Sequence, residues 1–183
     1  MEHEWSDGSA VETYTGRGFD VFDPDPATVH LADIAAGLAH TCRFGGHPQR
    51  FYSVAEHSLY VATELADEGG DRLALLGLLH DAGEAYVGDI PRPVKRRLDG
   101  FEEVEAAVLA AVWDGLGVDP PTESEWERVM AADDRLLTYE ADELLADGSW
   151  AGEPPALGYD LGRRPVDEVR ERFRTRAETL LGV

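Results

Sequence analysis

Apolar residues recur at helical spacing along most of the chain. One stripe runs through residues 53–67 and consists of Val54, His57, Val61 and Leu65, which are three or four positions apart. The middle of residues 71–86 is apolar on every side, which is typical of a central buried helix. The same pattern predicts helices over residues 28–40, 101–115, 122–146 and 165–181, and a short basic helix over residues 91–98.

Glycine and proline separate these helices. Gly69-Gly70 is expected to end the helix that begins after Ser53, and Ser53 is a suitable N-cap for it. Pro91 fits the start of the short basic helix, because proline is tolerated in a first helical turn. Residues 147–164 are rich in glycine and proline and are a candidate loop over a pocket. Strand patterns are nearly absent.

These elements predict an all-α fold, a compact bundle of about six to seven helices in one domain. The length of 183 residues suits a single domain with its own core. We expect an N-terminal lead over residues 1–27 and a core over residues 28–146. Residues 147–183 are expected to form a loop and a C-terminal helix that packs on this core.

The chain is strongly acidic. It has 37 Asp and Glu residues against 16 Lys and Arg residues, a net charge of -21, and Lys95 is its single lysine. Such a surface repels nucleic acid polymers. The repulsion among carboxylates weakens a folded domain unless salt screens it, so the composition favours a halophilic source. An ordinary acidic protein is the alternative.

The apolar runs are short. The longest, Leu73–Leu79, cannot span a bilayer, and residues 1–20 contain no apolar stretch. Cys42 is the single cysteine, so no internal disulfide can form and a reducing compartment is compatible. We therefore expect a soluble, cytoplasmic protein with no membrane partner.

Histidine and aspartate occur where the helical pattern favours apolar residues. His57 and His80 lie on apolar stripes, Asp81 follows His80 directly, and Asp133 lies in the helix expected over 122–146. Burial without partners costs such side chains on the order of 2 kcal/mol or more each. Two imidazoles and two carboxylates suit Mn, Fe, Co, Ni or Zn more than Ca, and Mg is also compatible. For one histidine alone, a hydrogen-bonded core residue is the simpler interpretation.

Three blocks of sequence carry these side chains in a defined order: RFYSVAEHS, LLHDAGEAYVGDIPRPVK and AADDRLLTYEADEL. A histidine, a His-Asp pair and a distant aspartate form the arrangement of the HD-domain phosphohydrolases, which the chain resembles over about residues 28–146. The blocks look most like the 5′-deoxynucleotidase branch. The resemblance implies an HD-type helical bundle and one divalent metal ion. The ligands that it implies are His57, His80, Asp81 and Asp133.

Asp134 competes with Asp133 for the last ligand position, because both neighbour apolar positions of the same expected helix. The family pattern has Ala-Asp followed by a glutamate seven residues later. Ala132-Asp133 followed by Glu140 matches it, so we choose Asp133.

Two further carboxylates are candidate catalytic residues. Glu84 lies one turn beyond His80 on the expected helix face, where it can shuttle a proton without binding the metal. The alternative is that Glu84 only holds His80 in position. Asp89 precedes the short proline-containing helix, so a role as the cap of that helix already explains it. The resemblance adds a role for Asp89 in protonating the leaving group.

The resemblance also implies substrate contacts. Arg43 and Phe44 look like the family's Arg-aromatic pair, which contacts phosphate and stacks near the sugar. The chain departs from the pattern in having phenylalanine rather than tryptophan and a slightly different spacing to His57. His47 is a candidate pocket residue. Lys95, in a basic group with Arg92, Arg96 and Arg97, can attract a phosphate, although such a group is more often a solvated helix face.

Together these features predict a metal-dependent phosphohydrolase of small nucleotides. The expected reaction converts deoxynucleoside 5′-monophosphates to nucleoside and phosphate. A deoxynucleoside triphosphate triphosphohydrolase is the nearest alternative, and a non-catalytic protein that binds metal or nucleotide is another. The expected partner is the nucleotide substrate rather than a nucleic acid polymer, and a homodimer is left open.

Overall fold

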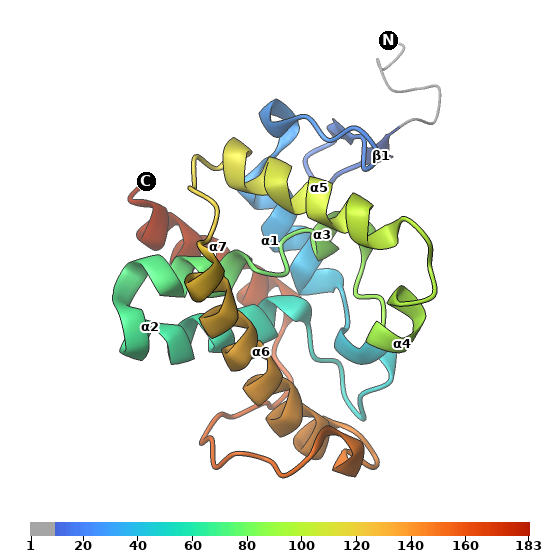
Figure 1. Cartoon of the computed structure of the whole chain (residues 1–183), viewed down its shortest axis with the longest axis vertical. Helices are drawn as coiled ribbons and strands as arrows, with labels where there is room; N and C mark the ends of the chain where they lie inside the picture. Colours follow the sequence, from blue (N-terminus) through green and yellow to red (C-terminus); the bar gives the residue numbers. More distant parts are fainter. Residues whose placement is uncertain (1–9) are drawn as a thin grey trace.

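The computed structural model describes residues 10–183, so the first nine residues of the expected N-terminal lead lie outside the described residues. The all-α fold is confirmed (Figure 1). The helices are α1 (Leu31–His40), α2 (Val54–Leu79), α3 (Glu84–Val87), α4 (Arg92–Lys95), α5 (Phe101–Gly115), α6 (Glu123–Leu144) and α7 (Val166–Leu181). Short 3-10 turns are η1 (Pro26–Thr28), η2 (Arg43–Gly46) and η3 (Ser149–Ala151).

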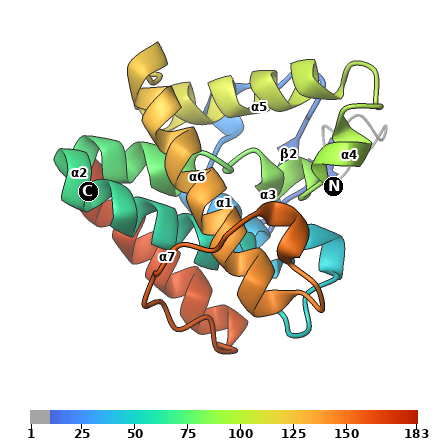
Figure 2. The ribbon, with the colours of Figure 1, turned by 60° about the horizontal axis from the view of Figure 1, so that its bottom comes forward.

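The helices pack around one apolar core. α6 crosses α2, and α7 packs against both α1 and α2, as Figure 2 shows from a second direction. α5 lies against η1, and α3 lies against α1. Fully buried core residues come from α1, α2, α6 and α7, among them Ile34, Leu65, Leu76, Leu136 and Phe173.

α2 begins where the sequence predicts, but it bends at Gly69-Gly70 instead of ending there. Ser53 is its N-cap, and the Ser53 hydroxyl accepts a hydrogen bond from the Glu56 amide while the Glu56 carboxylate accepts one from the Ser53 amide. The backbone leaves helical geometry at Gly69 and Gly70, and Gly70 has a φ of 67°, which glycine adopts without strain. The helix resumes directly afterwards, so α2 consists of two halves joined at a bend.

Other boundaries differ from the expected ones. α1 begins at Leu31 rather than residue 28, because Asp25 caps η1 instead and Val29 and His30 are extended. The expected helix 71–86 ends at Leu79, and i to i+3 hydrogen bonds carry the chain through a tight turn into α3. The short basic helix is limited to α4, four residues in all.

A small hairpin was not expected. β1 (Val11–Glu12) pairs antiparallel with β2 (Gly18–Phe19). The Phe19 ring is fully buried and stacks on Tyr86 at 3.8 Å between centroids, which fixes the hairpin on α3. Two-residue strands carry too little alternation to stand out in the sequence.

The loop 147–164 packs on the bundle. Its Leu161 forms a small apolar cluster with Tyr52 and Leu144, and the Tyr139 hydroxyl donates to the Tyr159 carbonyl at 2.8 Å. Among residues 10–183, no helix combines the length and apolar character that crossing a membrane requires.

Candidate metal centre

The bend in α2 brings its two ends together. A Cβ atom at Gly77 would lie 2.5 Å from Leu65 Cδ1, so the absence of a side chain at Gly77 lets the second half of α2 pack closely on the first. His57 lies toward the start of the first half and His80 follows the end of the second. Both histidines are buried, and their ring centroids are 5.3 Å apart.

Each histidine is held through Nδ1. His57 Nδ1 lies 2.8 Å from Glu140 Oε1, and His80 Nδ1 lies 2.7 Å from the Gly77 carbonyl oxygen. A carboxylate and a carbonyl only accept hydrogen bonds, so both Nδ1 atoms donate. This leaves the two Nε2 atoms for a ligand, and neither has a hydrogen-bond partner within the described part of the chain.

Two carboxylates face these Nε2 atoms. Asp81 Oδ2 lies 3.1 Å from His80 Nε2 and 3.8 Å from His57 Nε2. Asp133 Oδ1 lies 3.0 Å from His57 Nε2 and 3.9 Å from His80 Nε2. His57, His80 and Asp81 form a group that can hold a metal ion. Asp133 adds a fourth donor beside it, whereas the Asp134 side chain is exposed and faces Arg92.

The charges of this cluster depend on one another. Burial raises the pKa of Asp81, but His80 outweighs burial and holds the pKa at about 2. Burial raises the pKa of Asp133, but its neighbours, His57 first, lower it by more, so the net shift of this pKa is downward. Burial and Arg43 lower the pKa of His57, yet Glu140 and Asp133 raise it to about 9. A metal ion bound at His57 Nε2 would compete with a proton for that nitrogen.

Arg43 lies inside the same cluster. Its guanidinium donates to Glu140 Oε2 at 3.2 Å and lies 3.6 Å from Asp81 Oδ2. The side chain is buried, and its Nε has no partner within the described residues. Arg43 is placed in the cluster by η2, in which Phe44 has a φ of 55°. The centroid of the Phe44 ring lies 5.5 Å from the Arg43 guanidinium carbon. His47 is exposed at the end of this turn.

Asp89 does not cap the short basic helix. The cap position is occupied by Pro91, and Asp89 Oδ2 instead accepts a hydrogen bond from the Phe44 amide at 3.0 Å. This contact fixes the turn that carries Arg43. Burial raises the pKa of Asp89, Arg43 lowers it and Asp81 raises it further, with a net upward shift.

Glu84 lies close to the cluster on a different element from the one expected. It begins α3 after the tight turn, so it does not continue the helix that carries His80. Its Oε2 is buried and has no hydrogen-bond partner among residues 10–183. Glu84 does not hold His80, whose Nδ1 is bound by a backbone carbonyl. Burial, followed by repulsion from Asp81 and Asp89, raises the pKa of Glu84 well above its ordinary value.

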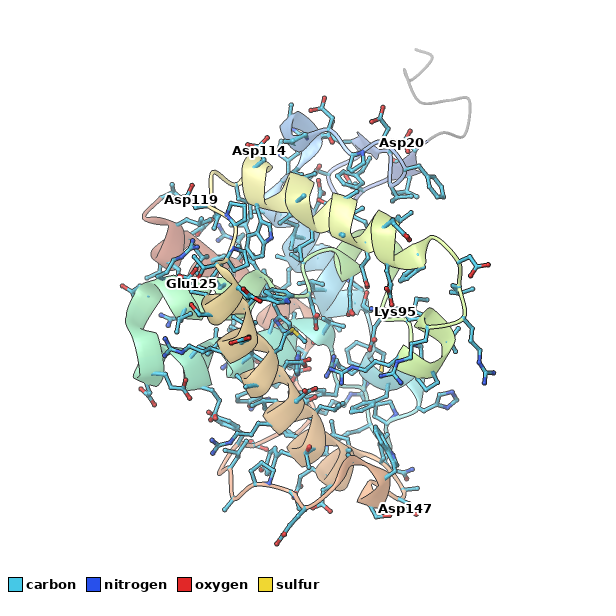
Figure 3. All side chains as sticks on the ribbon, in the orientation of Figure 1. Asp20, Lys95, Asp114, Asp119, Glu125 and Asp147 are labelled. Atoms are coloured by element: carbon cyan, nitrogen blue, oxygen red, sulfur yellow. The ribbon has the colours of Figure 1, made fainter. Side chains whose placement is uncertain are left out.

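The basic group around α4 is only partly a solvated face. Arg92 bridges Asp133 Oδ2 at 2.9 Å and Asp134 Oδ1 at 2.8 Å, which ties α4 to α6. Lys95 (labelled in Figure 3) is the last residue of α4 and contacts Glu105 Oε1 of α5 at 2.5 Å. Arg96 and Arg97 are exposed, as expected of a solvated face.

Sequence analysis assigned no role to two residues beneath the cluster. Glu140 is fully buried and binds His57, Arg43 and the Tyr52 hydroxyl, the last at 2.9 Å. In the sequence, Glu140 only matches the glutamate of the family pattern, and no motif marks Tyr52. Their separation along the chain, 88 positions, leaves no local spacing that could reveal the contact.

The fold and this cluster define a class: an all-helical protein with a His-Asp group, its histidines buried and Asp81 partly exposed, that can hold a metal ion. No protein-family model matches the chain. The chain is 35% identical to the uncharacterized protein RCAP_rcc00048 of Rhodobacter capsulatus over 182 residues, 91% of this chain and 93% of that protein. It is also 35% identical to the uncharacterized protein YfdR of Escherichia coli over 143 residues, 78% of this chain and 76% of that protein. The chain belongs to the family of these two proteins, whose printed names state no activity.

Proposed function

We propose that this protein is a metal-dependent phosphohydrolase of the HD type that acts on small nucleotides, most favourably deoxynucleoside 5′-monophosphates. One observation carries the proposal. Two buried imidazoles, each with Nδ1 already donated, direct free Nε2 atoms toward the carboxylates of Asp81 and Asp133. Burial of unpaired ring nitrogens is costly, and a bound cation offsets that cost.

The donor set fits a divalent ion of the Mn, Fe, Co, Ni or Zn type, because it mixes imidazole nitrogen with carboxylate oxygen. His57, His80, Asp81 and Asp133 would hold the ion. Such an ion activates water and polarises a phosphoryl oxygen. The Arg92 contact with Asp133 and the Glu140 contact with His57 keep two of the four side chains oriented.

Glu84 is the proposed acid-base residue. Its buried, unpartnered Oε2 and its raised pKa suit a carboxyl group that takes up and releases a proton during the reaction. It would take a proton from the attacking water or deliver one to the leaving alkoxide. Asp89, whose pKa is also raised, is a second candidate for protonating the leaving group, and it also holds the turn of Arg43.

Arg43 is the proposed phosphate contact. Asp81 and Glu140 hold its guanidinium inside the cluster, and its buried Nε has no hydrogen-bond partner within the described residues. Phe44 would lie beside the sugar. The arginine suits a phosphate because its planar fork matches phosphate oxygens.

A nucleotide panel tests the reaction. Ribo and deoxy monophosphates and triphosphates are incubated with Mn, Co, Mg or Zn, and the released products are identified. We expect inorganic phosphate from deoxymonophosphates. Release of triphosphate alone would replace the proposal with a triphosphohydrolase, and bound metal without any hydrolysis would favour a binding protein.

The role of Glu84 is tested by Glu84→Gln, which keeps the shape of the side chain but removes its acid. We expect kcat to fall at least about 100-fold, the lower range for a positioned acid-base group, while metal stays bound. Glu103→Gln, an exposed change on α5, is the control and should leave kcat unchanged. Loss of metal from Glu84→Gln would assign this carboxylate to the metal instead.

A further inference from the structure

A pocket opens on one side of the metal centre, between α3, α5 and α6. It holds about 280 Å³ and begins at His80, Asp81 and Glu84. Its far walls are Ala106, Leu109, Trp126 and Met130, and its remaining polar lining is Lys95, Glu102 and Glu105. We refer to it as the α5–α6 pocket. Arg43 and Arg92 do not line it.

The lining of this pocket has more acidic than basic side chains. Its lining contains the carboxylates of Asp81, Glu84, Glu102 and Glu105. Lys95 is already paired with Glu105. A phosphate entering here would find no unpaired cationic side chain in the lining, because Lys95 is held by Glu105. The α5–α6 pocket therefore suits the uncharged part of a substrate.

The size and the wall residues of the pocket narrow the class of ligand that it can bind. Ligand pockets typically measure about 300 to 1,000 Å³, so this one is small and suits a single ring system rather than a whole nucleotide. Trp126 and Met130 are partly buried and provide a flat aromatic surface and a polarizable thioether. Carboxylates accept hydrogen bonds and cannot donate them when ionised, so Glu102 favours a ring that presents N–H groups.

We propose that the α5–α6 pocket binds the base of the leaving nucleoside, a flat uncharged heterocycle with amino N–H donors, such as an amino-bearing nucleobase. The identification as a leaving group rests on the proposed phosphohydrolase function, while binding of the heterocycle does not. The buried, unpartnered Glu84 carboxyl lines this pocket beside His80. The leaving nucleoside would extend from this pocket past the proposed proton donor.

Binding is tested on the full-length, metal-loaded protein with a free nucleoside, which has no phosphate. Deoxyadenosine is titrated by calorimetry, and quenching of Trp126 is assigned by comparison with Trp126→Phe. Deoxynebularine (purine deoxyriboside) is the matched ligand, because it lacks the amino group and has no ring N–H donor. We expect deoxyadenosine to bind at least about 10-fold more tightly than deoxynebularine. Equal affinities would overturn the amino preference.

Two neighbouring alanines of α5 provide matched variants. Ala106 and Ala107 are both exposed, and only Ala106 lines the pocket. Ala106→Phe should fill the pocket and weaken deoxyadenosine binding at least about 10-fold, and Ala107→Phe should leave it unchanged. Equal affinity in both variants, at equal melting temperature, would overturn the pocket assignment.

The outcomes separate this inference from the proposed function. If nucleotides are hydrolysed but nucleosides do not bind, and Ala106→Phe leaves KM unchanged, the inference is wrong and the phosphohydrolase stands. If deoxyadenosine binds and Ala106→Phe blocks it while no phosphoester is cleaved, the pocket stands and the hydrolase proposal is wrong.

Discussion

Carboxylates occupy two different settings in this protein. In the buried centre, Asp81, Asp133 and Glu140 each lie beside a histidine or arginine nitrogen at a defined distance. On the surface, acidic side chains are spread from end to end of the molecule, as the labelled Asp114, Asp119 and Asp147 illustrate in Figure 3. The chain has too few cations to pair with all of them.

The difference shows what each set of charges contributes. A buried charge loses its hydration, so its partner is essential and removing one side chain leaves the other unpaired. An exposed carboxylate keeps its water, and salt screens its neighbours. Substitutions in the metal centre should therefore affect that site strongly, whereas changes in salt or pH should affect the whole surface.

Removal of a proposed metal ligand should have the largest effect. His80→Ala or Asp81→Ala should abolish activity and reduce bound metal, while helical content measured by circular dichroism stays largely intact in high salt. Asp134→Ala is the matched control, because Asp134 is exposed and lies next to Asp133. A ligand variant with near-normal turnover and bound metal would show that the site is assigned wrongly.

Glu140→Gln should have the next largest effect. It keeps the size of the side chain but weakens the acceptor for His57 Nδ1, so metal affinity should fall about 10- to 100-fold, the usual range for residues that orient a ligand. Isothermal titration with Mn measures this. Tyr52→Phe removes one contact to Glu140 and should act less strongly. Glu143→Gln, exposed on the same helix, should not change affinity, and an equal loss there would remove the specific role of Glu140.

Salt should affect the surface as a whole. Lowering salt from about 1 M to about 0.05 M lengthens the screening distance, so repulsion among carboxylates should lower the melting temperature. The shift should shrink near pH 4, where many carboxylates are protonated. A melting temperature that does not depend on salt at neutral pH would contradict the halophilic interpretation without touching the metal centre.

A single surface pair should have the smallest effect. Arg72 and the hydrogen bonds of the Thr122 cap lower the pKa of Glu125 to about 2 from an ordinary 4.5. The stabilisation is therefore present above about pH 4.5 and is lost as the pH falls through 2. Glu125→Gln can still cap α6, so it should lower stability at pH 7 by at most about 1 kcal/mol, a difference that disappears near pH 2.

Thermal melts across this pH range measure the contribution of Glu125. Glu127→Gln, an exposed change on the same helix, serves as the control. A difference between wild type and Glu125→Gln that persists at pH 2 would show that the Arg72 ion pair is not its source.

The helices were predictable because each is encoded locally. Ser53 and the Gly69-Gly70 bend mark α2 in the sequence, and α5 has the expected bounds, Phe101–Gly115. The end of α2 was not predictable, since the residues after Leu79 keep helical composition while the backbone tightens. The hairpin depends on Phe19 stacking on Tyr86, a tertiary contact.

The metal centre also contains residues that the sequence predicted and contacts that it did not. The sequence order indicated His57, His80, Asp81 and Asp133, which the structure gathers in one place. Spacing could not reveal that Asp89 binds the Phe44 amide rather than capping a helix. Nor could it reveal that Glu140 lies beneath His57, because the two are 83 positions apart. Contacts over such separations depend on how the helices pack.

A crystal structure of the Mn-loaded protein, with anomalous differences measured at the manganese edge, tests the metal centre most directly. The account predicts one strong peak within bonding distance of His57 Nε2 and His80 Nε2, with carboxylate oxygens of Asp81 and Asp133 completing the set. A fully loaded crystal with no peak between the two histidines, or with manganese bound only by surface carboxylates, would contradict it.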